Sequence, residues 1–265
     1  MNRIPVLSTH GLSKQFGGVA AVSGVSLDLL PGIVTALIGP NGAGKTTLIN
    51  LLTGVLRSDG GTITLKGEEI TKAPMHTRAR LGMARTYQTP QMIHELSAIA
   101  NVMAGAYRFG ADSLFKSILR PWTVATENEA LAERAAMALR RADVPEKWWD
   151  RSALDLPYGI QRRVEIARAL AQDPEVLLLD EPAAGLNPSE TAELATLLES
   201  IARDGRAVLL VEHDMPMVMS ISSHIVVVNF GRKIADGTPA EISSNPDVIA
   251  AYLGTDTEHV VEGVR

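Results

Sequence analysis

Residues 39–47, with the sequence GPNGAGKTT, restrict the possible folds of this chain more than any other stretch. They match the pattern G-x-x-x-x-G-K-[ST], between an apolar run at 34–38 that predicts a buried strand and a run at 48–52 that predicts a helix. Glycines in such a loop let consecutive amides point at one anion, and the helix adds the positive end of its dipole. An ordinary glycine-rich turn is the alternative, but this placement favours a nucleotide phosphate site.

The residues of this loop have separate predicted roles. Lys45 would reach the β and γ phosphates of the nucleotide, and the Thr46 hydroxyl would ligate Mg²⁺. The loop residues expected to bind the nucleotide are Gly39, Asn41, Gly42, Ala43, Gly44, Lys45, Thr46 and Thr47.

Composition excludes several classes of site. The 265 residues are 46% hydrophobic and 21% charged, which is typical of a globular protein rather than a disordered one. With no cysteine, the chain has no disulfide, thiolate metal site or cysteine nucleophile. A net charge of -5 gives no general attraction to nucleic acid, so no such partner is expected. The sequence predicts neither a signal peptide nor a membrane-spanning run, so we expect a cytoplasmic protein whose membrane role arises through partners.

Alternating strand and helix patterns predict the α/β class with a mainly parallel sheet. Strands are expected at residues 7–10, 25–29, 34–38, 58–67, around 84–90, 176–179, 207–211 and 225–230, and helices at 127–141, 160–172, 189–204 and 246–254, with Gly254 closing the last. We expect a single domain at residues 1–254. Its nucleotide-binding core comprises 1–88 and 158–240, its inserted helical subdomain 89–157 and its C-terminal helix 241–254, and 255–265 form a flexible tail.

Acidic residues and a histidine follow two predicted strands. Asp180 and Glu181 end the strand at 176–179, and His213 follows the strand at 207–211. Ligands of open parallel sheets bind at the carboxyl ends of the strands. Asp180 would hold Mg²⁺ through water, Glu181 would act as general base toward an attacking water, and His213 would lie near the γ-phosphate. The alternatives are a helix-capping acidic pair and an ordinary polar histidine.

Further residues are open to two interpretations each. Gln88 could touch Mg²⁺ and the attacking water, or it could be a solvent-facing loop residue. Phe16 could stack on the adenine base, or it could be a core or turn aromatic. Basic and aromatic residues of the helical segment could form a docking surface, or a solvated face with buried aromatics: Tyr107, Arg108, Phe109, Lys116, Arg120 and Trp122.

Taken together, these motifs resemble those of ATP-binding cassette (ABC) ATPases over nearly the entire chain. Residues 39–46 match the Walker A motif, and residues 177–181 match Walker B with its following glutamate. Phe16 matches the A-loop aromatic, and Val22 is expected beside the nucleotide. Gln88 matches the Q-loop glutamine, and His213 matches the switch histidine. Residues 156–163 match the signature, with Tyr158 and Gly159 expected to face the nucleotide.

The resemblance implies a fold, a reaction and an assembly. The fold is a P-loop NTPase (RecA-like) core with an N-terminal antiparallel β subdomain and an inserted helical subdomain. ATP with Mg²⁺ would be hydrolysed with Glu181, His213 and Gln88 as catalytic residues, and the metal would be held by Thr46, Gln88 and Asp180. Two such domains would meet head to tail, with each ATP between the Walker A of one and the signature of the other.

Within this family the chain resembles an ATPase subunit of bacterial branched-chain amino acid importers, through residues 158–170, 183–188, 237–239 and 245–254. The implied partners are two permeases, a second ATPase or a copy of this chain, and indirectly a periplasmic solute-binding protein, at the cytoplasmic face of the inner membrane. The alternatives are the ATPase of a lipopolysaccharide exporter or urea importer, a soluble ABC protein acting on ribosomes or DNA, and a P-loop kinase. The solute is not encoded in this chain.

Two residues depart from the family pattern. Pro157 stands in place of the signature serine, which removes a hydroxyl and an amide, and Asn187 stands where many members have an aspartate. We therefore predict that the ATP site using this signature is the weaker one of a pair.

Overall fold

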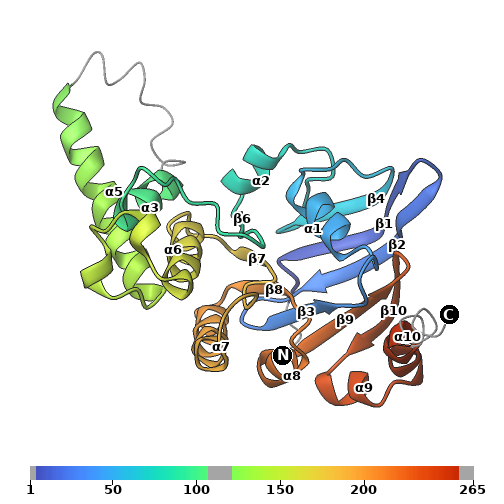
Figure 1. The fold of residues 1–265 in the computed structure, drawn as a ribbon. Helices are drawn as coiled ribbons and strands as arrows, with labels where there is room; N and C mark the ends of the chain where they lie inside the picture. The colour runs from blue at the N-terminus through green and yellow to red at the C-terminus, as the bar shows by residue number, and fades with distance from the viewer. Residues whose placement is uncertain (1–3, 107–120, 257–265) are drawn as a thin grey trace.

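The computed structural model describes residues 4–106 and 121–256, which form two sheets with helices around them (Figure 1). One sheet is four-stranded and antiparallel, in the order β2-β1-β4-β5, and the other is six-stranded, in the order β10-β9-β3-β8-β7-β6. The strands are β1 Leu7–Phe16, β2 Val19–Leu29, β3 Val34–Ile38, β4 Gly60–Leu65, β5 Glu68–Glu69, β6 Met83–Arg85, β7 Val176–Asp180, β8 Ala207–Val211, β9 His224–Asn229 and β10 Arg232–Gly237.

The six-stranded sheet is parallel except for β10, which pairs antiparallel with β9. This arrangement confirms the predicted α/β class with a mainly parallel sheet. Strands β3, β7 and β8 are buried along their whole length, as expected for central strands covered on both faces. Asp180 at the end of β7 pairs in register with Val211 at the end of β8. The residues that follow both strands therefore emerge at one edge of the sheet.

Helices cover both faces of this sheet (Figure 1). The α-helices are α1 Lys45–Thr53, α2 Met75–Arg80, α3 Ala98–Ala106, α5 Pro121–Arg141, α6 Tyr158–Leu170, α7 Pro188–Arg203, α8 Met215–Ile221, α9 Pro239–Ser243 and α10 Pro246–Asp256. Short 3-10 helices span Glu146–Trp148 and Ala153–Asp155. Helix α1 shares one apolar core with the antiparallel sheet and β3, β7 and β8, so the segment after the phosphate loop is anchored on two sheets.

A helical block formed by α3, α5 and α6 projects from the sheet, at the left of Figure 1. Its apolar side chains join those of α7 and of one face of the sheet in a single core. None of the helices in the described part of the chain combines the length and apolarity needed to cross a lipid bilayer. Of the proposed docking surface, Tyr107, Arg108, Phe109, Lys116 and Arg120 lie outside the described residues, as does the side chain of Trp122.

Several element boundaries differ from the sequence predictions. Strands β1 and β2 are longer than predicted, because they continue to a turn at Gly17 and Gly18, while irregular pairing near Gly11 interrupts the alternation of buried side chains. Helix α10 continues through Gly254 to Asp256, so the prediction that this glycine closes the helix was wrong. Strand β10 and helices α8 and α9 were not predicted.

Candidate active site

The loop between β3 and α1 has a backbone that only glycine can follow at two points. A Cβ atom on Gly39 would lie 2.0 Å from the carbonyl oxygen of Val228, and one on Gly44 would lie 2.3 Å from that of Ala21. Gly42 has a φ of +76°, in the left-handed region that favours glycine. Gly44 also caps the amino end of α1. The loop is therefore held between β2 and β9 with its amides at a helix N-terminus, as an anion cradle requires.

Lys45 folds back over this loop. Its Nζ donates hydrogen bonds to the carbonyl oxygens of Gly39 at 2.6 Å and Pro40 at 3.0 Å. Burial lowers the pKa of Lys45, while the charges of Glu181 and Asp180 act in the opposite direction. The ammonium group thus lies in the concavity of the loop and within the field of both carboxylates, which is where a triphosphate would need a counter-charge.

Asp180 is buried at the end of β7, and its carboxylate has a charged partner that the sequence analysis missed. Arg85 of β6 donates from Nη2 to Asp180 Oδ2 at 2.9 Å and from Nη1 to Asn50 Oδ1 at 2.5 Å. The guanidinium also lies over the ring of Tyr87. The signal for this partner in the sequence was the cationic residue Arg85, which ends a short strand of otherwise buried residues. Arg85 compensates the charge of the carboxylate that was predicted to hold Mg²⁺.

The three predicted catalytic side chains lie together. Gln88 Nε2 donates to Glu181 Oε2 at 2.6 Å, and His213 Nδ1 lies 3.9 Å from the same oxygen. Glu181 has a φ of 48°, which is uncommon for a residue with a side chain and occurs often at functional sites. The His213 side chain is 68% exposed, so its ring faces solvent at this edge rather than filling the core. A glutamate, an amide and an imidazole therefore surround one point beside the phosphate loop.

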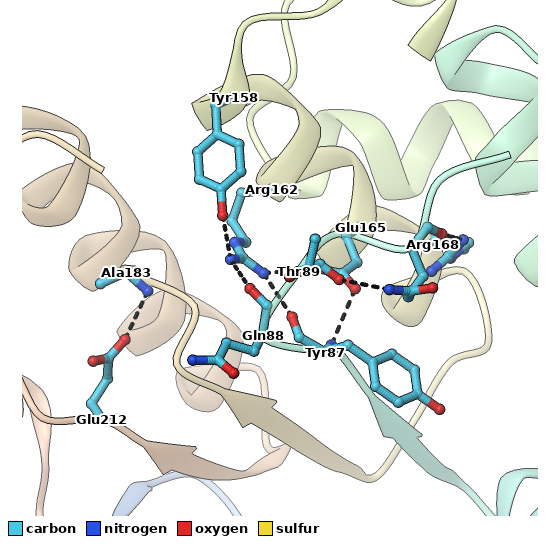
Figure 2. Close-up of polar contacts among 10 residues, drawn as sticks. Tyr87, Gln88, Thr89, Tyr158, Arg162, Glu165, Arg168, Ala183 and Glu212 are labelled. Atoms are coloured by element: carbon cyan, nitrogen blue, oxygen red, sulfur yellow. Dashed lines mark hydrogen bonds and ion pairs between the residues drawn. The ribbon is translucent and has the colours of Figure 1, made fainter. Parts of the chain in front are cut away.

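Glu212 is a functional candidate that the sequence analysis did not identify. Its side chain is buried, and its carboxylate accepts hydrogen bonds from the backbone amides of Ala183 at 2.7 Å and His213 at 3.1 Å. Figure 2 shows the bond to Ala183 joining the loops after β7 and β8. Burial raises the pKa of Glu212, although these amides act against the shift. A glutamate directly after an apolar strand is the same signal that identified Asp180.

The signature segment lies at the amino end of α6. Pro157 occupies the N-cap position, and it offers no side-chain acceptor to the first turn. The Tyr158 ring lies against Gly185, where a Cβ would be 3.1 Å from Tyr158 Cε1, and Gly159 faces the carboxylate of Glu190. Asn187 caps α7 in a reciprocal capping box with Glu190. The structure thus gives Asn187 a local role in starting a helix.

Phe16 and Val22 lie on the β1–β2 hairpin. Phe16 is 46% exposed beside the turn, with the Lys14 ammonium 5.6 Å from the centre of its ring. Its exposure is compatible with stacking on a base and does not fit a core role. Val22 is buried in the apolar core, so it supports the hairpin rather than offering a surface to a ligand.

The remaining residues of the phosphate loop differ in exposure. Thr46 and Asn41 are exposed, Thr47 is half-buried and Ala43 is buried. Within residues 4–106 and 121–256, no group of three or more histidine or acidic side chains could hold a metal. The predicted donors are instead the Thr46 hydroxyl, the Asp180 carboxylate and the Gln88 amide oxygen. Such an all-oxygen set, completed by water and phosphate, fits Mg²⁺, which rarely uses a cage made of protein alone.

Comparison with known families gives two matches. The family described as ABC transporter matches residues 22–184, and the family described as branched-chain amino acid ATP-binding cassette transporter matches residues 232–258. The first match covers the phosphate loop, the helical block and the end of β7. The second lies in the C-terminal segment that contains β10, α9 and α10.

Curated relatives and solved structures extend these matches along the chain. The chain is 47% identical over 252 residues to the high-affinity branched-chain amino acid transport ATP-binding protein BraF of Pseudomonas aeruginosa, covering 94% of this chain and 98% of the relative. It is 46% identical to LivG of Escherichia coli, with the same coverage. A crystal structure of the ADP conformation of an ATP-binding cassette of an ABC transporter superposes with a TM-score of 0.83, at 32% identity, covering 95% of this chain and 99% of that one.

Proposed function

This chain belongs to the ABC transporter family of ATP-binding proteins, and from that premise we propose that it is the ATP-hydrolysing subunit of an importer for branched-chain or related amino acids. Members of this family are ATPases that power transport. The proposal is carried by one observation: Gln88, Glu181 and His213 meet beside Lys45 in a chain 47% identical to a branched-chain amino acid transport ATP-binding protein.

ATP would bind by its phosphates to the loop between β3 and α1. The loop amides and the amino end of α1 supply partial positive charge, and Lys45 supplies a full charge for the β and γ phosphates. To do so, Lys45 exchanges its two carbonyl partners for phosphate oxygens. Phe16, exposed on its hairpin, would stack on the base.

Glu181 would serve as the general base. It accepts the proton of the attacking water, whose oxygen then bonds to the γ-phosphorus as the bond to the β-phosphate oxygen breaks. Gln88 orients this carboxylate through their 2.6 Å hydrogen bond, and His213 is near enough to contact the γ-phosphate. Mg²⁺, held by Thr46, Gln88 and Asp180, would neutralise charge that develops on the phosphate oxygens.

A second ATPase domain is needed to complete each site in this proposal. Tyr158 and Gly159 at the start of α6 would face the nucleotide bound to the partner, which is either a different ATPase or a copy of this chain. ATP would then favour the closed pair, and hydrolysis would release it, since a ligand shifts an equilibrium by its difference in affinity for the two states. The other proposed partners are two permeases and, indirectly, a periplasmic solute-binding protein. They would hold this chain at the cytoplasmic face of the inner membrane.

The experiment that tests this function is uptake of radiolabelled leucine in cells that lack this chain. Wild-type chain should restore uptake, whereas Glu181→Gln should bind Mg-ATP normally by calorimetry but lower turnover and uptake by about 10²-fold or more, because the base is lost. Glu199→Gln, the same change at a partly exposed residue of α7, is the matched control and should behave as wild type.

Three outcomes would contradict the proposal. Leucine uptake that survives deletion, while urea uptake or lipopolysaccharide export fails, would assign the chain to another transporter. Recovery of ribosomes rather than two hydrophobic permeases from solubilised membranes would exclude transport. Unchanged hydrolysis by Glu181→Gln would remove Glu181 from the role of base.

A further inference from the structure

Arg162 in α6 is fully buried, although it carries a permanent charge. Its guanidinium donates from Nη1 to the main-chain carbonyl oxygen of Tyr87 at 2.7 Å and from Nη2 to that of Gln88 at 2.5 Å. Nη2 also donates to the Tyr158 hydroxyl at 2.8 Å. Figure 2 shows Arg162 between Tyr158 and the Tyr87–Gln88 backbone. One planar side chain therefore joins the first turn of α6 to a loop 74 residues earlier.

Glu165, one turn further along α6, completes this connection. Its carboxylate pairs with Arg162 at 3.2 Å and accepts a hydrogen bond from the Tyr87 amide at 3.1 Å. The pair is almost entirely shielded from solvent, with side-chain exposures of 0% and 1%. A buried ion pair contributes little net stability compared with apolar residues of the same volume. The main effect of this pair is therefore to fix the position of the Tyr87 backbone relative to α6. Both the amide and the carbonyl of Tyr87 are held by α6.

The two ends of this connection lie at different parts of the proposed ATP sites. At one end, the Gln88 side chain donates to Glu181, the proposed base. At the other end, the Tyr158 ring lies against Gly185 and is 39% exposed at the start of α6. If α6 shifted, the Gln88 backbone would move with it. The reason is that the hydrogen bonds from Arg162 to the Tyr87 and Gln88 carbonyls fix the distance between this backbone and α6.

We propose that Arg162 is a positioning residue that fixes the backbone of Gln88 to the first turn of α6, so that the placement of Gln88 against Glu181 depends on Tyr158 in the signature segment. This inference rests on the proposed function, because it takes Gln88 and Glu181 as groups acting on bound ATP. It adds a route by which a nucleotide touching Tyr158 in the partner's site alters the water-activating groups of this chain's own site.

Substitution of Arg162 by lysine separates charge from geometry. A lysine keeps the charge beside Glu165, but its single ammonium cannot span two carbonyls and a phenol as the planar guanidinium does. Arg162→Lys should therefore lower kcat about tenfold with KM for ATP changed less than about twofold, because small misplacements of catalytic groups are costly. Tyr158→Phe removes only the hydroxyl, keeps the ring against Gly185, and should lower kcat about threefold.

A double-mutant cycle with Gln88→Ala distinguishes positioning from general damage. If Arg162 acts through Gln88, then Arg162→Lys should lower turnover little further in the Gln88→Ala background, whereas independent effects would multiply. Arg141→Lys is the control, since Arg141 also makes hydrogen bonds between elements, but to Asp204 and Ser200 at the carboxyl end of α7 rather than to the Gln88 backbone. The proposal would be overturned if the losses of turnover multiplied in the double variant. It would also be overturned if Arg141→Lys lowered turnover as much as Arg162→Lys does.

Hydrogen exchange of the full-length chain gives a readout that needs no turnover. Exchange at residues 86–89 should accelerate at least about fivefold in Arg162→Lys and stay unchanged in Arg141→Lys, because the Tyr87 amide loses its fixed partner. Unchanged exchange in Arg162→Lys would contradict the inference even if ATP hydrolysis by the wild-type chain is normal. Absent hydrolysis in the wild type, with accelerated exchange in the variant, would instead count against the proposed function alone.

Discussion

The phosphate loop and the signature segment are built in contrasting ways. At the phosphate loop, backbone contacts set the shape: Gly39 approaches Val228, and the Gly231 amide donates to the Ala43 carbonyl at 2.9 Å. At the signature segment, side chains set the shape, with Tyr158 held by the buried guanidinium of Arg162. The shape of the phosphate loop depends on glycines that have no Cβ atom, whereas the shape of the signature segment depends on the hydrogen bond between Arg162 and Tyr158.

This contrast explains where the chain departs from its family pattern. Replacing any loop glycine that lies against backbone forces the main chain to move, so the motif at residues 39–46 leaves little freedom. In the signature segment, Pro157 occupies the N-cap of α6, and the residue after it is held by a side-chain hydrogen bond from within the chain. The consequence is a conventional phosphate site beside an unusual signature.

The largest expected effect tests the backbone side of this comparison. Gly39→Ala should lower the free energy of unfolding by about 3 kcal/mol, because its Cβ would meet the Val228 carbonyl at 2.0 Å. Gly17→Ala is the control: its φ is +50°, but a Cβ there meets no described atom within 4 Å, so only about 1 kcal/mol is expected. Urea unfolding without nucleotide measures both. Equal losses would mean that backbone crowding does not shape the loop.

A smaller effect is expected on the signature side. Pro157→Ser should raise ATP turnover of the assembled complex about two- to threefold, since it restores the hydroxyl and the amide that the proline lacks. The serine would also cap α6 and stabilise the chain by about 0.5–1 kcal/mol. Pro157→Ala, which restores the amide alone, separates the two contributions. A lower ATP turnover in Pro157→Ser would refute the prediction that the ATP site using this signature is the weaker one of a pair.

The smallest effect concerns Glu212, which connects the loops after β7 and β8. Because burial raises its pKa above the ordinary 4.5, the native state binds more protons than the unfolded state between the two values. The stability from this group is therefore present below about pH 4.5 and is lost as pH rises through the native pKa.

Glu212→Gln removes this titration but keeps an oxygen that can accept from the Ala183 amide. Its free energy of unfolding relative to wild type should therefore increase as the pH of urea unfolding experiments rises from about 4 to about 8. A difference that does not vary with pH would show that Glu212 does not carry the raised pKa.

The sequence predicted those features that depend on local patterns. The α/β fold and the ABC family were confirmed, and Gln88, Glu181 and His213 lie together, while their catalytic roles remain predictions. The Arg162 contacts to the Tyr87 and Gln88 carbonyls were not predicted, because these partners lie 75 and 74 residues away in the sequence. A signal did exist: Arg162 and Glu165 are one turn apart on a buried face of an amphipathic helix, where unpaired charges are rare.

The contact between β2 and the phosphate loop has a consequence for ligand selection. A Cβ on Gly44 or Gly231 would collide with the Ala21 carbonyl, so β2 packs directly against this loop and against the turn between β9 and β10. The same hairpin carries Phe16, which pairs with Val19 at its turn. If the aromatic ring receives a base, the span between base and phosphates is set by the main chain. The site would then select ligands by length, and inorganic pyrophosphate, which has no base, would contact only the phosphate loop.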